Sequence, residues 1–200
     1  MSAKVLSKGA EAYLLEATFL SRPVVIKERR PKLYRIIQID SALRRERTLS
    51  EARLLSAAKQ AGVLCPLVQF VDCQRMRIFE EKLDGKLLSS ASPAVRSKNA
   101  KVAGVLLGRL HSAGIYHGDY TTANLMLCKK GLYVIDFGLS ERSLRFEDYA
   151  TDLLLYKKAV TEKEFAAFLS GYKKVNPNVQ AVVRQLCDIE SRGRYVSRSQ

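Results

Sequence analysis

Two short apolar segments in the middle of the chain, 124–128 and 132–135, restrict the fold more than any other feature. They are joined by a Lys-Lys-Gly turn, so the pattern predicts a tight hairpin of two strands. Such a hairpin would bring Asn124 and Asp136 to the same end, five and seventeen residues after Asp119. Asp119 can orient a hydroxyl group and take its proton. Asn124 and Asp136 offer the hard oxygen ligands that Mg²⁺ prefers.

These three side chains belong to an ordered pattern, H-x-D-x-x-x-x-N followed by D-F-G. Any one of the acids alone would be a solvated loop residue in most proteins, whereas the ordered set is hard to obtain by chance. A base, two metal ligands and a glycine that lets the backbone turn beside them are what phosphoryl transfer requires. The pattern therefore predicts a nucleotide site with Asp119 as the base.

The first part of the chain is predicted to form a hairpin of strands over 13–19 and 24–28. A turn of small residues at its entry, around Gly9 and Ala10, could lay backbone N–H groups over phosphates. The glycine-rich pattern G-x-G-x-x-G is absent, and a single glycine is also an ordinary turn residue.

A lysine–glutamate pair is expected between the second of these strands and the helix that follows. Lys27 ends a β-branched run, and the pattern predicts a helix over about 41–60. Glu51 falls on the apolar face of that helix, in line with Leu54 and Leu55. A carboxylate there is costly unless it is paired, and Lys27 is the natural partner. Taken by itself, Lys27 would be a strand-edge lysine that reaches solvent.

Two more strands are predicted over 66–71 and 75–79, and the segment 80–85 would then link two lobes. Its backbone could hydrogen-bond an adenine ring, which makes Glu81 and Leu83 candidate contacts for the base of a nucleotide.

Helices are predicted over 95–113, 147–160, 162–172 and 178–190. Asp152 could be a buried acid that receives backbone N–H groups from the catalytic loop, or an acid on the helix surface. His111 is expected to be structural, and His117 to brace the loop rather than transfer protons. Gly104 and Gly108 either permit close helix packing or weaken the helix; the pattern leaves both open.

Composition sets wide limits on the class of protein. The 200 residues are 47% apolar, enough for one large domain or two lobes. No run approaches the roughly 20 apolar residues of a membrane span, and the first residues lack a secretory signal. Four cysteines without C-x-x-C spacing predict buried free thiols in a reducing compartment: Cys65, Cys73, Cys128 and Cys187. We expect a cytoplasmic protein, also nuclear if the source is a eukaryote.

The formal charge of +14 indicates an acidic partner, with nucleic acid first among the candidates. Solubility alone is the simpler explanation. Eight of the basic residues fall within 27–47, against three acids, and the segment 191–200 is polar and basic as well. The pattern predicts RNA contact through this basic surface, together with a mobile basic tail.

The motifs as a set resemble the protein-kinase superfamily, and more narrowly the small atypical serine/threonine kinase of the KEOPS complex (the PRPK or Bud-type family). The narrower resemblance covers nearly the whole chain and rests on the segments 9–12, 26–35, 43–48, 117–124, 135–139, 147–153 and 192–194.

This resemblance implies an α+β bilobal protein-kinase-like fold. The N-lobe, 1–82, would hold a small antiparallel sheet and one main helix; the reduced, mostly helical C-lobe would span 83–190, before a basic tail at 191–200. It also implies ATP and Mg²⁺, serine/threonine phosphorylation, and an ATPase activity that supports threonylcarbamoyladenosine formation in tRNA. The expected partners are the threonylcarbamoyl transferase subunit and a small Cgi-type subunit of KEOPS.

By position, the resemblance assigns the base to Asp119 and the magnesium ligands to Asn124 and Asp136. The implied nucleotide contacts are Gly9, Ala10, Lys27, Glu51, Glu81, Leu83, Asn124 and Asp136. One departure from ordinary protein kinases is Gly118, which replaces the arginine of H-R-D. Without that arginine to bind a phosphorylated activation loop, control by partner binding is expected.

Two other functions remain open. A small-molecule kinase of the aminoglycoside or choline type also uses H-G-D, but builds its substrate pocket from extra C-terminal helices, and only about sixty residues follow Asp136. A non-catalytic tRNA-binding scaffold would not need the base Asp119.

Overall fold

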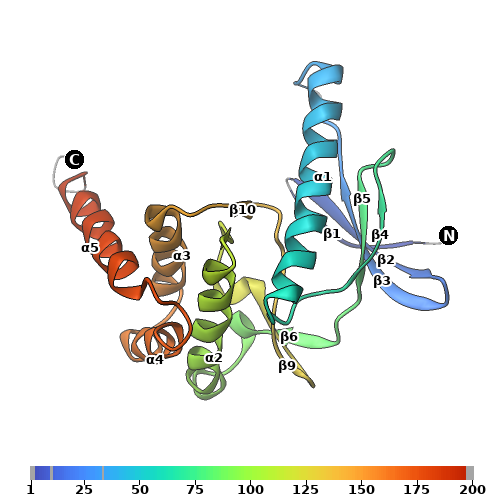
Figure 1. The fold of residues 1–200 in the computed structure, drawn as a ribbon. Coiled ribbons are helices and arrows are strands. Elements are labelled where there is room, and N and C mark those ends of the chain that lie inside the picture. Colours follow the sequence, from blue (N-terminus) through green and yellow to red (C-terminus); the bar gives the residue numbers. More distant parts are fainter. Residues whose placement is uncertain (1–2, 10, 33, 197–200) are drawn as a thin grey trace.

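The computed structural model of the protein describes residues 3–9, 11–32 and 34–196. A sheet with one long helix forms one part, and four shorter helices with two small sheets form the other (Figure 1). This is the predicted α+β arrangement of two lobes.

The N-lobe contains a five-stranded antiparallel sheet in the order β1-β2-β3-β5-β4. Its elements are β1 (Lys4–Lys8), β2 (Ala12–Phe19), β3 (Arg22–Arg29), α1 (Ile37–Gln60), β4 (Val68–Asp72) and β5 (Arg77–Glu81). Strand β3 pairs with β2 and β5, which places Lys27 between Leu14 and Ile78. Because side chains alternate along a strand, Val24 and Ile26 face the opposite side from Lys27, where they join a small apolar cluster.

The C-lobe begins where the chain leaves β5 and enters a second sheet with the order β6-β8-β9. Its strands and helices are β6 (Gly85–Leu87), α2 (Pro93–Ser112), β7 (Ile115–Tyr116), β8 (Leu125–Cys128), β9 (Gly131–Val134), β10 (Glu141–Arg142), α3 (Phe146–Lys158), α4 (Glu162–Tyr172) and α5 (Val179–Val196). Single 3₁₀ turns lie at Leu88–Ser90 and Thr122–Asn124. The predicted hairpin is confirmed, with Leu125 paired to Val134 and Cys128 to Gly131.

One apolar core runs through both lobes. Leu54 and Leu55 of α1 belong to the same buried cluster as Leu107 and Leu110 of α2. Phe137, which follows β9, is buried in this cluster too. Because interiors are packed to nearly crystalline density, the lobes are held together along this line.

Helices α2 and α4 cross at unusually short range, and glycines make this possible. A Cβ atom at Gly104 would lie 1.9 Å from the carbonyl oxygen of Phe168, and one at Gly171 would lie 2.0 Å from that of Lys101. A Cβ at Gly108 would lie 2.4 Å from the side chain of Val175. The question that the sequence left open is settled: Gly104 and Gly108 serve close packing.

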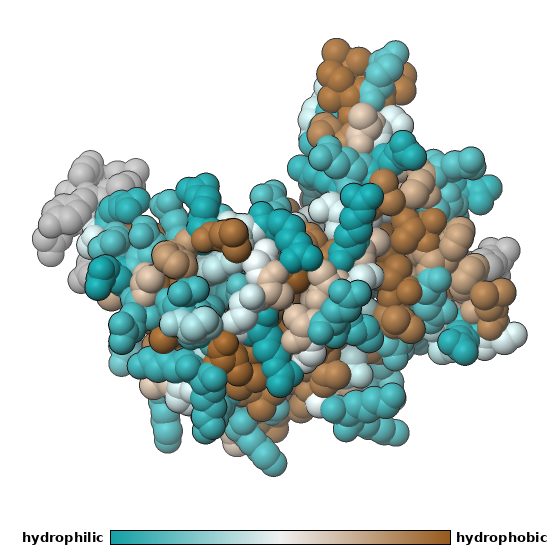
Figure 2. Space-filling view, in the orientation of Figure 1, coloured by the Kyte–Doolittle hydropathy of each residue, from teal (hydrophilic) through white to brown (hydrophobic). Residues whose placement is uncertain are grey.

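Several boundaries differ from the predicted ones. Strand β1 was not predicted: the sequence indicated only a turn around Gly9 and Ala10, and the five residues of β1 are all exposed. Helix α1 begins at Ile37 rather than near Ser41. Its first turns project beyond the sheet and bury little apolar surface, so the apolar pattern did not indicate them. Figure 2 shows apolar residues gathered at this free end, where Ile36, Ile37 and Ile39 are exposed.

The end of the chain also differs. The predicted mobile tail from 191 onward is wrong for its first residues, because helix α5 continues to Val196. Helix α5 packs on α3, and residues 197–200 lie outside the described part of the chain.

The four cysteines are free, as predicted, but they are not all buried. Cys65 is fully buried, Cys73 and Cys128 are partly exposed, and Cys187 is exposed on α5. Among the helices of the described residues, none combines the length and apolar character that crossing a membrane would require.

The glycine contacts generate a stability prediction. Substitution Gly104→Ala should lower the free energy of unfolding by about 3 kcal/mol, because the new methyl group would push α2 from the α4 backbone. Urea unfolding followed by circular dichroism would measure it. Ser97→Ala, at an exposed position of the same helix, is the control and should change stability by less than about 0.5 kcal/mol. A Gly104→Ala protein as stable as the parent would contradict the close crossing.

Candidate active site

A cavity of about 330 Å³ lies between the two lobes. Four residues singled out in the sequence line it: Gly9 and Lys27 from the N-lobe, Asp119 and Asp136 from the C-lobe. The remaining lining residues are Ser7, Glu11, Ala12, Leu14, Arg29, Gly138 and Leu139. The sequence motifs of the two lobes, about ninety or more positions apart, therefore meet in one place.

Lys27 is held between two carboxylates, one from each lobe. Its Nζ lies 2.5 Å from Oε1 of Glu51 on α1 and 2.6 Å from Oδ1 of Asp136. Glu51 is only 2% exposed, so the predicted pairing with Lys27 is confirmed. Burial alone would lower the pKa of Lys27, but the carboxylates of Glu51 and Asp136 outweigh it and raise that pKa. The lysine is therefore charged at every ordinary pH.

Asp136 is the one of these carboxylates that faces the cavity, since 54% of its side chain is exposed. Burial acts to raise its pKa, but Lys27 and the backbone N–H of Gly138 hold the pKa below its ordinary value. Its φ of 62° is a strained conformation for a residue other than glycine. A Cβ at Gly138 would lie 3.0 Å from Asp136 Oδ1 and 3.1 Å from Lys27 Nζ, so a glycine keeps this space open.

Asp119 and Asn124 form a second pair, on the C-lobe side of the cavity that Asp119 lines. The Nδ2 of Asn124 donates to the carboxylate Oδ2 and to the carbonyl oxygen of Asp119, both at 2.8 Å. The Asn124 amide oxygen thus remains the atom available to a cation. The Asn124 carbonyl accepts from Ile135 N at 2.9 Å, which places Asn124 and Asp136 at the same end of the hairpin, as predicted.

Asp152 is fully buried behind the catalytic loop. Its carboxylate accepts the backbone N–H groups of His117 at 2.7 Å and Gly118 at 2.9 Å. His111 Nε2 lies 3.1 Å from the same carboxylate, and His111 Nδ1 lies 2.8 Å from the hydroxyl of Tyr172. Of the two alternatives for Asp152, the buried one is correct, and His111 is structural as expected.

The loop itself depends on His117 and Gly118. The His117 ring is buried against Tyr120 and Phe137, and burial lowers its pKa. Its Nδ1 accepts the backbone N–H of Asp119, so this histidine braces the base. Gly118 has a φ of 82°, and a Cβ there would lie 2.4 Å from the Leu139 carbonyl oxygen. An arginine in this position would therefore displace the segment after D-F-G.

Of the predicted nucleotide contacts among the described residues, Gly9, Lys27 and Asp136 line this cavity, whereas Glu51, Glu81, Leu83 and Asn124 do not. Glu81 lies at the end of β5, where its N–H donates to the Leu67 carbonyl oxygen, and Leu83 follows in the link to β6. Neither residue lines the cavity, so their contact with an adenine ring stays a prediction. Ala10 lies outside the described residues.

Two charged residues of the site were missed. Arg29 is on β3 two positions after Lys27, and Glu80 of β5 pairs with Val25, two positions before it. Alternation along paired strands places both on the side of Lys27, which is the signal that could have found them.

Glu80 is partly exposed as a residue, but protein encloses its carboxyl group. Burial and the negative charge of Glu51 raise the pKa of Glu80 to about 8, although Lys27 opposes this. The ordinary value is 4.5, so the surroundings in the folded protein favour the protonated form of this carboxyl group.

The donor set fits a magnesium-bound nucleotide. Asn124 and Asp136 supply two oxygen ligands, and Mg²⁺ normally completes its shell with water and phosphate oxygens. Accordingly, the described residues contain no cluster of three or more histidine, cysteine or acidic side chains that would hold an ion by itself. The Lys27 ammonium group lines the same cavity and can bind phosphate oxygens.

This fold and site define a protein-kinase-like class. The solved structure of the Rio2 kinase from Chaetomium thermophilum superposes with a TM-score of 0.67, covering 100% of this chain and 74% of that one at 16% identity. A profile of the lipopolysaccharide kinase (Kdo/WaaP) family matches residues 26–172.

The particular family follows from closer relatives. The KEOPS complex subunit Bud32 of Pyrococcus abyssi is 39% identical, with 98% of each chain covered. The chain belongs to this Bud32 family of kinases. A probable bifunctional tRNA threonylcarbamoyladenosine biosynthesis protein of Methanobrevibacter smithii is also 39% identical, over 96% of this chain. The chain spans 36% of the length of that bifunctional relative.

Glu80 generates a prediction about pH. Because its folded pKa lies above the unfolded value, its contribution to stability is complete below about pH 4.5 and is lost as the pH rises toward about 8. Glu80→Gln should remove this loss and exceed the parent in stability above pH 8 by about 1–3 kcal/mol. Chemical unfolding between pH 5 and pH 9 would measure it.

Glu81→Gln is the matched control and should keep the slope of the parent, since the Glu81 carboxylate binds only the exposed Leu67 N–H. If the free energy of unfolding changed equally with pH in the parent and in Glu80→Gln, the surroundings of Glu80 would not favour its protonated form.

Proposed function

We propose that the chain is an ATP-dependent phosphotransferase, acting as an ATPase and serine/threonine kinase within a KEOPS-type complex that supports threonylcarbamoyladenosine formation in tRNA. The observation that carries this proposal is the cavity lined both by Lys27, with its ion pairs, and by Asp119, whose carboxylate Asn124 orients. A purely structural role would need neither the base nor its partner.

Each residue has a separate task in this proposal. Lys27, fixed by Glu51, would bind phosphate oxygens of ATP, and the oxygens of Asn124 and Asp136 would hold Mg²⁺. The ion, when bound, neutralises charge on the phosphates. Asp119 presents a carboxylate, oriented by Asn124 Nδ2, that can accept the proton of an attacking water or hydroxyl group. Asp152 keeps the loop of Asp119 in place through two backbone hydrogen bonds.

The lining of the cavity supports a protein or water acceptor over a small molecule. Among the described residues, none that lines it comes from α3, α4 or α5. The large side chains of these helices are buried in the core instead, including Tyr156, Phe168 and Tyr172. The helices that would build a small-molecule pocket are thus used for packing.

The names of the relatives support the proposed partners. The bifunctional relative carries in one chain a region like this one together with further sequence, and the Pyrococcus abyssi relative is a subunit of comparable length. We propose the threonylcarbamoyl transferase subunit and a small Cgi-type subunit as partners. With no arginine at Gly118, partner binding would supply the control of activity. We also propose a cytoplasmic location, and a nuclear one as well in a eukaryote.

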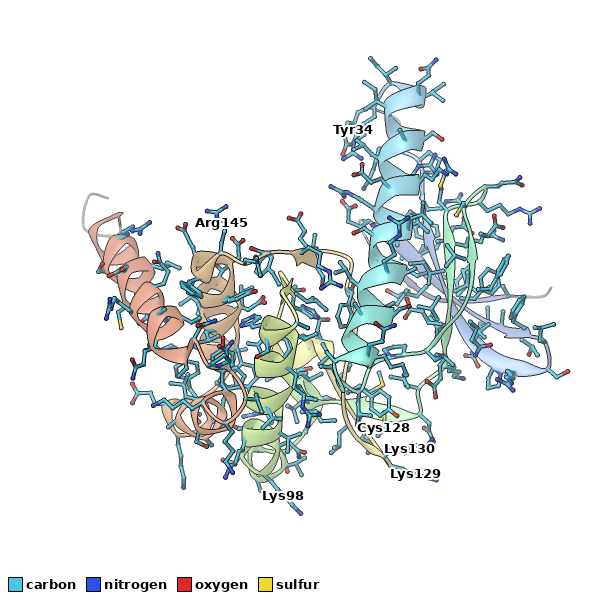
Figure 3. All side chains as sticks on the ribbon, in the orientation of Figure 1. Tyr34, Lys98, Cys128, Lys129, Lys130 and Arg145 are labelled. Atoms are coloured by element: carbon cyan, nitrogen blue, oxygen red, sulfur yellow. The ribbon has the colours of Figure 1, made fainter. Side chains whose placement is uncertain are left out.

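A tRNA contact is proposed from charge. The net charge is +14, and basic side chains extend from several parts of the C-lobe. Figure 3 shows Lys129 and Lys130 pointing outward from the β8–β9 turn, Lys98 from α2 and Arg145 from α3. All four are exposed, and Arg145 also pairs with Glu147 at 3.1 Å; exposed cations of this kind can approach phosphates.

Two alanine variants test the phosphotransferase proposal. Asp119→Ala should reduce ATP turnover by at least about 100-fold while ATP binding survives, because the base acts on the acceptor rather than on the nucleotide. Asp136→Ala should weaken Mg²⁺-dependent ATP binding as well. Phosphate release and calorimetric titration, each with the partner subunits present, would measure the two effects.

Asp84→Ala, an exposed acid of the link between the lobes, is the control and should behave like the parent. Unchanged hydrolysis in both Asp119→Ala and Asp136→Ala would remove the enzymatic proposal.

The tRNA proposal predicts strong dependence on salt. Raising the salt from 50 to 200 mM should weaken tRNA binding at least about tenfold, because counterions compete for the phosphates. Fluorescence anisotropy of labelled tRNA would measure the affinity. An affinity that stays constant across this range would rule out a charge-driven contact.

A further inference from the structure

Arg29 shares the carboxylate that positions Lys27. Its Nη2 lies 2.6 Å from Oε2 of Glu51, while Lys27 holds the other oxygen of that carboxylate. Arg29 also lines the cavity, although only 4% of the residue is exposed. Strand β3 therefore presents two cations to one side of the site, and one buried glutamate serves both.

The guanidinium group of Arg29 has unused donors. Its Nε is buried and has no acceptor among the described residues. Its Nη1 reaches only Oε2 of Glu11, at 4.0 Å, and that oxygen is closer to Arg47, at 2.9 Å. Burying a charged donor without a partner is costly, so such a group marks a place where a ligand binds.

The position of this group suits a phosphate. A Cβ at Gly138 would lie 3.6 Å from Arg29 Nη2 and 3.1 Å from Lys27 Nζ, so both cations lie beside Gly138, and all three residues line the cavity. A guanidinium group can bind two phosphate oxygens at once, whereas an ammonium group acts as a point charge.

The turn between β1 and β2 explains why a side chain is needed here. Phosphate-binding turns normally use backbone N–H groups, but the N–H of Gly9 donates to the Ala12 carbonyl oxygen at 3.0 Å. The same turn adds a negative charge at the cavity through Glu11, whose side chain is 49% exposed. Lys27 already balances two carboxylates, so a triphosphate needs a further cation.

We propose that Arg29 is a second cation of the phosphate subsite and binds the terminal phosphate of a nucleoside triphosphate, a role that rests on the proposed use of ATP in this cavity. Glu11 is the carboxylate near Arg29 in this structure. On binding, the terminal phosphate replaces it as the partner of Arg29. The competing explanation is that Arg29 only fixes Glu51.

Nucleotide affinities separate the two explanations. With Arg29→Gln, calorimetric titration with Mg²⁺ should show at least tenfold weaker binding of ATP, and less than threefold change for AMP. Arg47→Gln is the matched control, because Arg47 also pairs with Glu11 but does not line the cavity. It should keep the ratio of ATP to AMP affinity of the parent.

A second measurement avoids any loss of folding in the Arg29 variant. In the parent protein labelled with ¹⁵N-arginine, the Nε signal of Arg29, assigned by its disappearance in Arg29→Lys, should shift on addition of ATP and not of AMP. A signal that ATP leaves in place would overturn the proposal.

The outcomes distinguish this inference from the proposed function. If the parent binds ATP but Arg29→Gln weakens ATP and AMP alike, Arg29 only fixes Glu51 and the phosphotransferase proposal stands. If the parent does not bind ATP in the presence of Mg²⁺, both proposals fail.

Discussion

The ammonium group of Lys27, held between Glu51 and Asp136, is the interaction on which the rest of the structure depends. It joins helix α1 of the N-lobe to the segment after β9 in the C-lobe, with N–O distances of 2.5 and 2.6 Å. Removing one partner from a buried ion pair costs about 3–5 kcal/mol, because the other charge is left uncompensated. The orientation of the lobes and the charge of the cavity are therefore set together.

Hydrogen bonds and apolar packing hold the surroundings of this ion cluster in place. Behind the catalytic loop, Asp152 accepts two backbone N–H groups and contacts His111, and the side chains of Asp152, His111 and His117 are buried. Below it, apolar side chains of α1 and α2 form one core. The proposed base and metal ligands thus lie on elements that packing holds in place, and a site needs such support to keep catalytic geometry.

Much of the site could be predicted, because its residues leave short, regular signals. The spacing of Glu51 on the apolar face of α1 was enough to predict its pairing with Lys27, and the β8–β9 hairpin followed from two apolar runs around a glycine. Helix α4 has the predicted bounds, and a capping box between Thr161 and Glu164 accounts for its sharp start. In each case the local sequence and the packing favour the same structure.

The remainder depends on tertiary contacts. Strand β1 has no buried face, so nothing in its sequence distinguishes it from a loop. The first turns of α1 and the last turns of α5 extend where periodicity fades. Arg29 and Glu80 are charged residues on strands: Arg29 lies one position beyond the predicted strand 24–28, and only the pairing of β3 with β5 places Glu80 on the side of Lys27. Asp152 could not be placed from its own helix, since its ligands are backbone groups of a distant loop.

The central claim is that side chains from both lobes converge on one magnesium-bound triphosphate. A crystal structure with Mg²⁺ and a non-hydrolysable ATP analogue tests it most directly. The account predicts an ion bound by the oxygens of Asn124 and Asp136, phosphates at Lys27, and the Asp119 carboxylate facing the terminal phosphate. A nucleotide bound outside this cavity, or an ion that contacts neither Asn124 nor Asp136, would contradict it.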